Sequence, residues 1–247
     1  FGVDDAVALA RRSQKEVVFM GIGFETTAPT TASALLTDPP PNFAVLSCHR
    51  LVPPALEAIA EMGEVRLNGM IQPGHVSTII GTRPYEFLSK KYGIPQVVAG
   101  FEPLDLLMGV YMLAVQVKEG RAAVENEYKR VVHTEGNPIA LKAIKDAFEP
   151  MSVRWRGFPV IKGSGLEIQK KLEQHDARKR FEDLLRPVRE REHSEARGCR
   201  CGEMLRGMAV SEDCPLFGKR CTPGTPVGPC MVSREGSCYI SYRYMKK

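Results

Sequence analysis

The chain has 247 residues, of which 43% are hydrophobic and 26% are charged, and its net charge is +5 at pH 7. A chain of this length and composition forms one large globular domain or two ordinary ones. No apolar run approaches the roughly 18 residues of a membrane span, and basic residues are interleaved with acidic ones, so neither a membrane nor a nucleic-acid partner is expected. The chain opens at Phe1 without a signal-peptide pattern, which predicts a cytoplasmic protein.

Short apolar runs alternate with amphipathic segments through the first 150 residues. Strands are expected over 16–23, 43–48, 67–74 and 95–101, and helices over 26–36, 53–62, 83–92 and 102–120. Strands that alternate with helices predict βαβ units and a parallel sheet, and continuous apolar strands fit burial on both faces. The expected fold class is α/β, with a parallel-sheet βαβ domain over 1–150. A C-terminal part over 151–247 would then contain a small, loop-rich cysteine module.

A distinctive peptide follows each expected strand: GIGFETT, CHR, PGHVS and GFEPLD. Ligands of parallel sheets bind beyond the carboxyl ends of the strands, so these peptides predict one shared site. His75 in PGHVS would lie in a loop, where the Pro-Gly turn projects its ring from the end of the sheet. Imidazole moves protons near neutral pH, although a lone histidine is more often a hydrogen-bonded structural residue. The residues alone leave both interpretations of His75 open.

Other polar residues of these peptides have structural interpretations. Glu25, Glu102 and Asp105 precede expected helices, where a carboxylate suits the positive end of the helix dipole, and Thr26 or Thr27 is a candidate cap. GIGF lacks the third glycine of a GxGxxG motif, which argues against a Rossmann fold. Cys48 and His49 would point to opposite faces of a strand, so Cys48 is expected to be a core residue.

The regular alternation ends near residue 150. Residues 154–165 have strand and turn character, and residues 167–200 are rich in interleaved basic and acidic side chains. This charge pattern predicts a solvated surface helix over 167–200.

Cysteines are concentrated at the end of the chain. Residues 1–198 contain only Cys48, whereas the last 49 residues contain Cys199, Cys201, Cys214, Cys221, Cys230 and Cys238. A core-rich chain with one dense cysteine cluster favours an intracellular metal or redox site over a disulfide scaffold. The density of Pro and Gly between these cysteines predicts loops wrapped around a ligand.

The cysteine spacing favours a wide ligand. The steps Cys201–Cys214–Cys221–Cys238 are 13, 7 and 17 residues. A structural zinc site usually pairs cysteines two to four residues apart, whereas an iron–sulfur cluster accepts wider spacings and often a Pro after a ligand, as in Cys214-Pro215. Zinc and disulfides remain alternatives. Glu235, three residues before Cys238, would exchange protons beside such a centre or serve as an ordinary surface carboxylate.

Several long motifs resemble one family. GIGFETTAPTTA (21–32), QPGHVSTIIG (72–81), VVAGFEPLDLL (97–107), VENEYKRVV (124–132), WRGFPVIKGSGL (155–166) and the tail from CGEMLRG to MVSREGSC (201–238) are similar to the [NiFe]-hydrogenase maturation factor HypD family. The resemblance runs nearly from end to end, and the motifs occur in the family's order.

The resemblance implies a scaffold for assembly of the Fe(CN)₂CO group of [NiFe] hydrogenase, rather than a conventional turnover enzyme. It implies two α/β domains and a C-terminal [4Fe–4S] module, with the small chaperone HypC and the cyanide-supplying HypE and HypF as partners. By motif, the cluster ligands would be Cys201, Cys214, Cys221 and Cys238. Cys199 and Cys230 would fall outside this quartet. His75 and Glu235 would occupy the family's functional polar positions.

One departure from the family concerns the iron that is being assembled. The family's CGGH and GCPVC motifs, whose thiols are thought to hold that iron, do not occur here. The sequence is therefore expected to be N-terminally truncated, with the second α/β domain and the cluster module present. A protein limited to these residues is not expected to assemble the group.

Two other functions are compatible with the residues. The first is a zinc-stabilised protein-docking module without redox chemistry. The second is a thiol–disulfide oxidoreductase, which usually needs an accessible CxxC pair of low pKa; the closest pair here is Cys199 and Cys201.

Overall fold

A computed structural model describes residues 2–156, 158–189 and 197–244. The chain divides into two compact units. Unit 1 comprises Phe1–Leu56, Asn68–Val153 and Lys162–Arg191, and unit 2 comprises Glu57–Leu67, Arg154–Ile161 and Glu192–Lys247. The α/β class with parallel sheets is confirmed, and the expected domain boundary near residue 150 stays a prediction.

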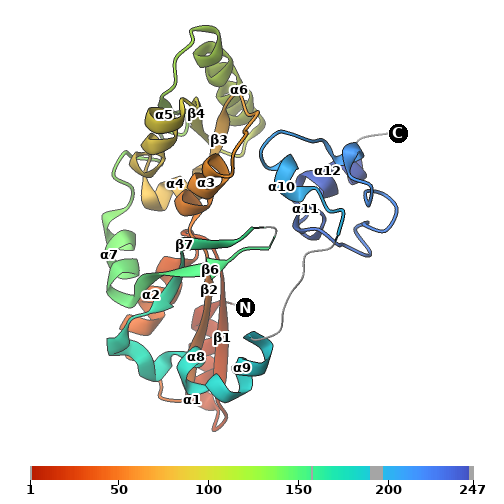
Figure 1. Cartoon of the computed structure of the whole chain (residues 1–247). Helices are drawn as coiled ribbons and strands as arrows, with labels where there is room; N and C mark the ends of the chain where they lie inside the picture. The colour runs from red at the N-terminus through yellow and green to blue at the C-terminus, as the bar shows by residue number, and fades with distance from the viewer. Residues whose placement is uncertain (1, 157, 190–196, 245–247) are drawn as a thin grey trace. The chain divides into compact units, whose positions relative to one another are not determined.

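The first sheet of unit 1 pairs β1 (Val17–Gly23) with β2 (Phe43–His49) in parallel (Figure 1). The helix α2 (Ala28–Leu36) connects the two strands, and α1 (Val3–Arg12) packs against β1. The core here includes the fully buried Phe43 and Leu35. Burying each such side chain stabilises the fold by roughly 1.5–3 kcal/mol.

Later segments of the chain return to this sheet. The helix α7 (Pro138–Ala147) packs against α2. It begins where the side chain of Asn137 accepts the amide hydrogens of Ile139 and Ala140, with Pro at the first helical position. The strands β6 (Phe148–Arg154) and β7 (Val160–Ile168) then pair with each other. Ser47 of β2 donates a hydrogen bond to the carbonyl of Leu166 at 2.6 Å, which fixes β7 beside β2.

The second sheet of unit 1 has the order β3-β4-β5, with all pairs parallel. Its strands are β3 (Met70–Pro73), β4 (Gln96–Ala99) and β5 (Val124–Asn126). The four strands expected from the sequence are thus divided between two sheets instead of joining one. A buried amide pair contributes to this pairing, because Gln72 donates to the side-chain oxygen of Gln96 at 2.8 Å. A different neighbour would leave this buried donor and this buried acceptor without each other.

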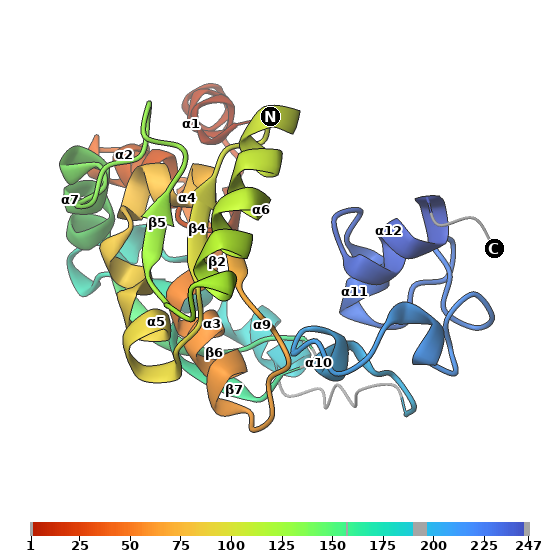
Figure 2. The ribbon, with the colours of Figure 1, turned by 90° about the horizontal axis from the view of Figure 1, so that it is seen from above.

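Helices surround the second sheet. After β2, the chain forms α3 (Val52–Glu61); after β3, it forms α4 (Gly74–Ile80), the 3₁₀ turn η1 (Arg83–Tyr85) and α5 (Glu86–Tyr92). The helix α6 (Pro103–Lys118) follows β4 and packs along it (Figure 2). Within the part of the chain that the structure describes, no helix is both long enough and apolar enough to cross a bilayer.

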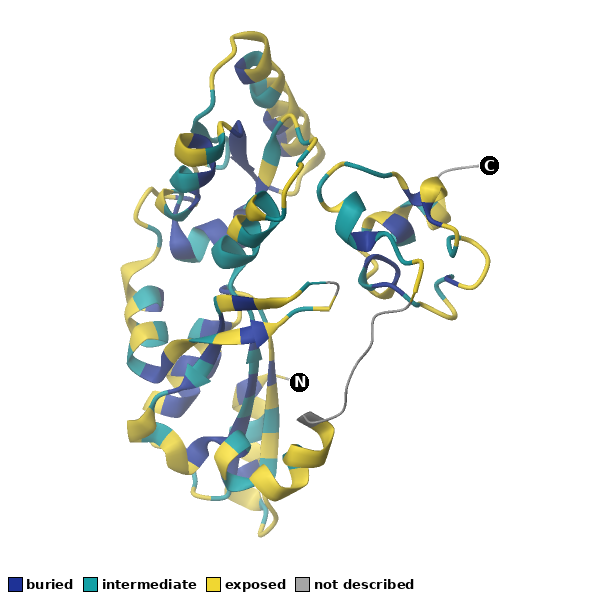
Figure 3. Ribbon diagram, viewed as in Figure 1, coloured by how far each residue is buried: buried dark blue, intermediate teal, exposed yellow. Residues whose placement is uncertain are grey.

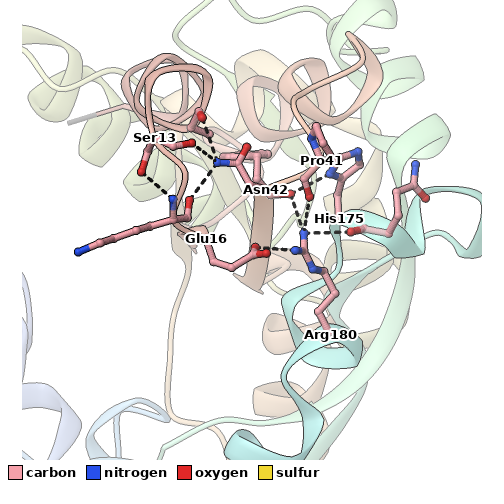
Figure 4. Close-up of polar contacts among 10 residues, drawn as sticks. Ser13, Glu16, Pro41, Asn42, His175 and Arg180 are labelled. Carbon is pink, nitrogen blue, oxygen red and sulfur yellow. Dashed lines mark hydrogen bonds and ion pairs between the residues drawn. The ribbon is translucent and has the colours of Figure 1, made fainter.

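The charged segment after β7 is not the single solvated helix that its composition predicts. Its described part is broken into η2 (Lys170–His175), α8 (Ala177–Arg180) and α9 (Glu182–Arg189), and residues 190–196 lie outside the described residues. Figure 4 shows why the first part is not solvated: His175 hydrogen-bonds to the carbonyl of Phe43 at 2.8 Å, and Arg180 donates to that of Pro41 at 2.9 Å. These backbone contacts hold the segment against β2. The helix α9 is largely exposed (Figure 3), as the charge pattern predicts.

Unit 2 consists mainly of loops and short helices, as its Pro and Gly content predicts. The helices are α10 (Cys201–Met204), η3 (Ser211–Asp213), α11 (Pro229–Val232) and α12 (Ser237–Tyr244). Arg206 donates to the carbonyl of Met62 at 3.0 Å, and its own carbonyl accepts the amide of Arg66 at 2.8 Å. Residues 57–67 are therefore fixed to this unit by backbone hydrogen bonds.

Candidate functional site

The centre of unit 2 is built from thiols instead of large aliphatic side chains. Cys201 opens α10, Cys230 lies on α11 and Cys238 lies on α12, while Cys221 lies in the loop before α11. All four are buried and pack together with Met231. The short helices α10, α11 and α12 each carry one of these cysteines and bring them together although they are far apart in the sequence.

Three of these thiols form a hydrogen-bonded group. The side chains of Cys201, Cys230 and Cys238 hydrogen-bond to one another. Hydrogen bonds from Cys201 and Cys230 stabilise the thiolate of Cys238 and lower its pKa. The pKa of Cys201 is raised, first through its hydrogen bond to Cys230. The thiolate is the form of cysteine that binds metal, so this lowered pKa is compatible with a ligand role for Cys238.

Two further cysteines of unit 2 lie differently. Cys214 is buried, but it is not part of the packed cluster, and its Sγ lies 3.8 Å from the carbonyl oxygen of Gly198. Cys199 is half-buried, and its Sγ lies 3.4 Å from that of Cys201. The structure thus brings together three of the four ligands expected from the sequence, adds Cys230 to them and leaves Cys214 outside this packed group.

A glycine leaves space for the sulfurs. A Cβ atom at Gly228 would lie 2.5 Å from the Sγ of Cys199 and 2.7 Å from that of Cys201. Only a residue without a side chain fits there. The backbone of Val227, beside this glycine, donates to the Sγ of Cys221 at 3.3 Å. The loop before α11 therefore lies directly on the thiols.

The thiols suit an iron–sulfur cluster in donor type and burial, because such clusters are held by cysteine thiolates. Within residues 2–156, 158–189 and 197–244, no three His, Cys, Asp or Glu side chains are placed to hold a single metal ion. The quartet of Cys201, Cys214, Cys221 and Cys238 stays a prediction. Spacing alone did not identify Cys230, since its contact with the other thiols depends on how α11 packs against α12.

Glu235 lies in the turn between α11 and α12, where its side chain is exposed. Its amide donates to the Oγ of Ser233 at 3.2 Å, which shapes this turn. The turn leads directly to Cys238, three residues after Glu235. The Glu235 carboxylate is therefore accessible to solvent and close to the thiol group along the chain.

His75 occupies a different environment from the expected one. The prediction of a loop was wrong, because α4 begins at Gly74 directly after β3 and His75 lies in its first turn. Gly74 permits this abrupt start, since a Cβ there would lie 2.4 Å from the carbonyl oxygen of Ala99. The His75 ring is exposed and lies against Phe101, with 4.1 Å between the ring centroids. The ends of β3 and β4 thus present an imidazole and an aromatic ring side by side.

Near this aromatic pair lies an ion pair that the sequence did not reveal. Arg130 donates two hydrogen bonds to Asp105, at 2.9 Å and 2.7 Å, and its guanidinium lies 4.4 Å from the ring centroid of Tyr128. The hydrogen bond from Arg130 lowers the pKa of the Asp105 carboxyl. The prediction that Asp105 suits the start of a helix is confirmed, since it lies in the first turn of α6 and accepts the amide hydrogen of Glu102 at 3.4 Å. The only sequence signal for this ion pair was the occurrence of Arg130 within the motif VENEYKRVV.

Comparison with known proteins identifies the family. Residues 1–245 match the family model described as "HypD: Hydrogenase formation hypA family". The chain belongs to the HypD family.

Relatives in the HypD family are similar over nearly all of this chain. A Methanocaldococcus jannaschii protein named for hydrogenase expression/formation is 46% identical, covering 100% of this chain and 68% of the relative. The hydrogenase maturation factor HypD of Cupriavidus necator is 44% identical, covering 99% of this chain and 66% of the relative. The hydrogenase maturation factor HypD of Rhodobacter capsulatus is 45% identical, covering 97% of this chain and 65% of the relative. The chain therefore spans about two thirds of the length of the curated HypD relatives that it matches.

The first family motif of this HypD chain, GIGFETT, holds a buried acid. The prediction that Glu25 suits the start of the following helix was wrong: its Oε1 accepts the amide hydrogen of Val52, at the start of α3, at 2.9 Å. Burial raises the pKa of Glu25 to about 7. Thr27 precedes α2, but its hydroxyl donates to the carbonyl of Phe24 at 3.2 Å instead of capping that helix.

The second strand of the HypD chain ends in a buried histidine. The two ring nitrogens of His49 lie 3.4 Å and 3.2 Å from the hydroxyls of Thr27 and Thr31. Burial, and then the charge of Arg50, lower the pKa of His49 to about 4. Cys48 is half-buried, so the prediction of a core position was only partly right. His49 is a neutral structural residue at neutral pH.

Proposed function

We propose that this HypD-family chain takes part in assembly of the Fe(CN)₂CO group of [NiFe] hydrogenase and carries a redox-active [4Fe–4S] cluster in unit 2. The observation that carries the proposal is the buried group of cysteine thiols at the centre of unit 2. Thiols in an apolar enclosure favour cluster binding, because burial and hydrogen bonds to sulfur set the reduction potential. Family membership supports the role in hydrogenase maturation.

Cys201, Cys214, Cys221 and Cys238 would hold the cluster, which supplies single electrons when it is bound. His75 and Glu235 are exposed, so both are able to exchange protons with solvent and with a bound partner. The ring of Phe101 restricts the orientation of the His75 imidazole. These residues divide the chemistry into an electron-supplying centre in unit 2 and proton-transfer groups in both units.

The iron of the Fe(CN)₂CO group is cargo, and other residues hold it. In the family, these are the thiols of the CGGH and GCPVC motifs, which do not occur in this sequence. The complete reaction would therefore involve a longer chain, as in the relatives of which this chain covers about two thirds. It would take place in the cytoplasm with HypC as the chaperone partner and with HypE and HypF as the source of cyanide.

Genetic complementation tests this function. The full gene product would be supplied to a host that lacks its own HypD-family gene, and hydrogenase activity would be measured. His75→Ala and Glu235→Gln should abolish maturation without changing the iron content of the purified protein. The matched controls are His133→Ala and Glu212→Gln, which alter exposed residues of the same two units. Equal activity of the His75 and His133 variants would show that His75 has no role.

A zinc-stabilised docking module remains the second candidate, because four buried thiols are also the donor set of a structural zinc site. In that case unit 2 would bind a partner without transferring electrons. Metal analysis of the purified protein separates the two functions.

A further inference from the structure

One aromatic side chain contacts the residues that follow both β3 and β4. Tyr128, which comes after β5, is half-buried and packs against the core that includes Val76 and Val98. A Cβ atom at Gly74 would lie 2.9 Å from Cδ1 of Tyr128, and one at Gly100 would lie 2.8 Å from its Cε2. These two carbons are on opposite sides of the ring. The Tyr128 ring therefore touches the chain at the ends of two neighbouring strands, where neither glycine has room for a side chain.

Each of these glycines precedes one member of the aromatic pair at this edge of the sheet. Gly74 is followed by His75, and Gly100 is followed by Phe101. The two rings lie 4.1 Å apart between centroids, with 34° between their planes. Both residues are exposed and belong to separate segments of the chain. The contacts of Tyr128 with the two glycines fix the backbone directly before each ring.

Tyr128 is in turn held by Arg130. The guanidinium lies 4.4 Å from the centroid of the Tyr128 ring, within the range of a cation–π interaction. It also donates two hydrogen bonds to Asp105, whose side chain is only 5% exposed. A planar, bidentate pair of this kind fixes the position of a guanidinium. A Cβ atom at Gly100 would overlap with the same Asp105 carboxylate, so the ion pair and the Tyr128 ring meet at one glycine.

We propose that Tyr128 is a positioning residue, which holds His75 against Phe101 and is itself held by Arg130. This inference rests on the proposed function in one respect, namely that His75 exchanges protons. The orientation of an imidazole decides which neighbouring atoms its two nitrogens reach, and proton transfer requires hydrogen-bond distance. Tyr128 acts through the two glycines on the backbone of the aromatic pair. Without its ring, the chain ends of β3 and β4 move apart, and the His75 ring turns away from Phe101.

Nuclear magnetic resonance of the His75 ring tests the inference in the full chain, labelled with carbon-13 in its histidines alone. The variant His75→Ala assigns the signal. At about pH 8.5, above the ordinary titration range of imidazole, stacking on Phe101 should move the His75 C2 proton upfield, and Phe101→Leu gives the unstacked position. Tyr128→Leu should remove at least about half of this shift, whereas Tyr128→Phe, which keeps the ring, should retain it. Arg130→Lys should give an intermediate shift, because lysine does not form the bidentate pair.

Hydrogenase maturation in the complementation assay should follow the same order: Tyr128→Leu should reduce it and Tyr128→Phe should restore it. The matched control is Tyr111→Leu, since Tyr111 lies on α6 and is 62% exposed. It should leave the His75 signal at its wild-type position.

Circular dichroism shows whether each variant has folded, and Arg130→Lys replaces Tyr128→Leu in the comparison if the latter is unfolded. The inference is overturned if the folded variant keeps the wild-type His75 signal, or if the wild-type signal already lies at the Phe101→Leu position. Full maturation by His75→Ala would instead overturn the proposed role of His75 and leave the resonance shifts unaffected. The two failures are therefore distinguishable.

Discussion

The carboxylate of Glu25 accepts the amide hydrogen of Val52 at 2.9 Å, so the peptide after β1 holds the start of α3. Glu25 is 3% exposed, and its second oxygen has no hydrogen-bond partner within the part of the chain that the structure describes. A buried carboxyl in this position is more easily protonated than one in water. The family motif GIGFETT thus contains an acid whose charge opposes folding at neutral pH.

Glu25 should make the stability of unit 1 decrease as the pH rises. Its pKa is about 7 in the folded chain and 4.5 without burial, so between these values the native state binds the extra proton. We expect the unfolding free energy of Glu25→Gln, relative to wild type, to increase by about 3 kcal/mol between pH 4.5 and 7.5. Urea unfolding at several pH values measures this difference. A difference that does not change with pH would contradict the account.

His49 should change the stability of unit 1 with pH in the opposite direction to Glu25, so it serves as an internal comparison. Its pKa of about 4 in the folded chain lies below the ordinary 6.5, so in this interval the unfolded state binds the proton. Stability should therefore rise with pH from about 4 to 6.5 on account of His49. The two effects offset each other in wild type, and Glu25→Gln should reveal the rising contribution of His49 in this range.

The buried amides between β3 and β4 should contribute strongly to stability. The side-chain nitrogen of Gln96 donates to the carbonyl of Tyr85 at 2.9 Å and to the hydroxyl of Ser89 at 2.8 Å, and its oxygen accepts from Gln72. We expect Gln96→Leu to lower the unfolding free energy by about 3 kcal/mol, because it leaves several buried groups unpaired. Ser89→Ala, which removes one of these partners, should cost about 1 kcal/mol. If urea unfolding showed the same loss of unfolding free energy for Gln96→Leu and Ser89→Ala, the Gln96 amide would contribute no more than this one hydrogen bond.

The glycine beside the thiols provides a test of the site in unit 2. Gly228→Ala would place a methyl group within 2.7 Å of two cysteine sulfurs and should displace them. We expect this variant to lose most of its iron while unit 1 stays folded. Gly224→Ala is the matched control in the same loop, where the nearest atom to a Cβ is 3.9 Å away. Iron analysis of both proteins checks the prediction, and full iron in Gly228→Ala would refute it.

Much of unit 1 could be predicted from the sequence because strand and helix patterns are local. Starts of β1, β2 and β4 lie within one residue of the positions expected from their apolar runs. The division into two sheets was beyond such reasoning, since it depends on which strands pair. The helical start at His75 was also missed. Pro73-Gly74 has the composition of a turn, whereas α4 begins at Gly74. The close approach of Gly74 to the carbonyl oxygen of Ala99, which leaves no room for a side chain, depends on the fold and is not visible in the local sequence.

The sequence predicted the kind of side chain that forms the candidate site better than it predicted which cysteines lie together there. Cysteine density located the thiol group in unit 2, because metal-binding cysteines are concentrated where a small module must be held together. Spacing did not place Cys230 in the group or Cys214 outside it. Likewise, the pairing of Asp105 with Arg130 joins the first turn of α6 to a residue that follows β5, so it depends on the folded sheet. Contacts between distant residues decided each of these differences.

Iron and acid-labile sulfide in anaerobically purified protein test the central claim most directly. The account predicts about four iron and four sulfide per chain, with a broad visible absorbance that decreases on reduction. Colourless protein with one zinc and no sulfide would contradict the account and leave unit 2 as a zinc-stabilised docking module.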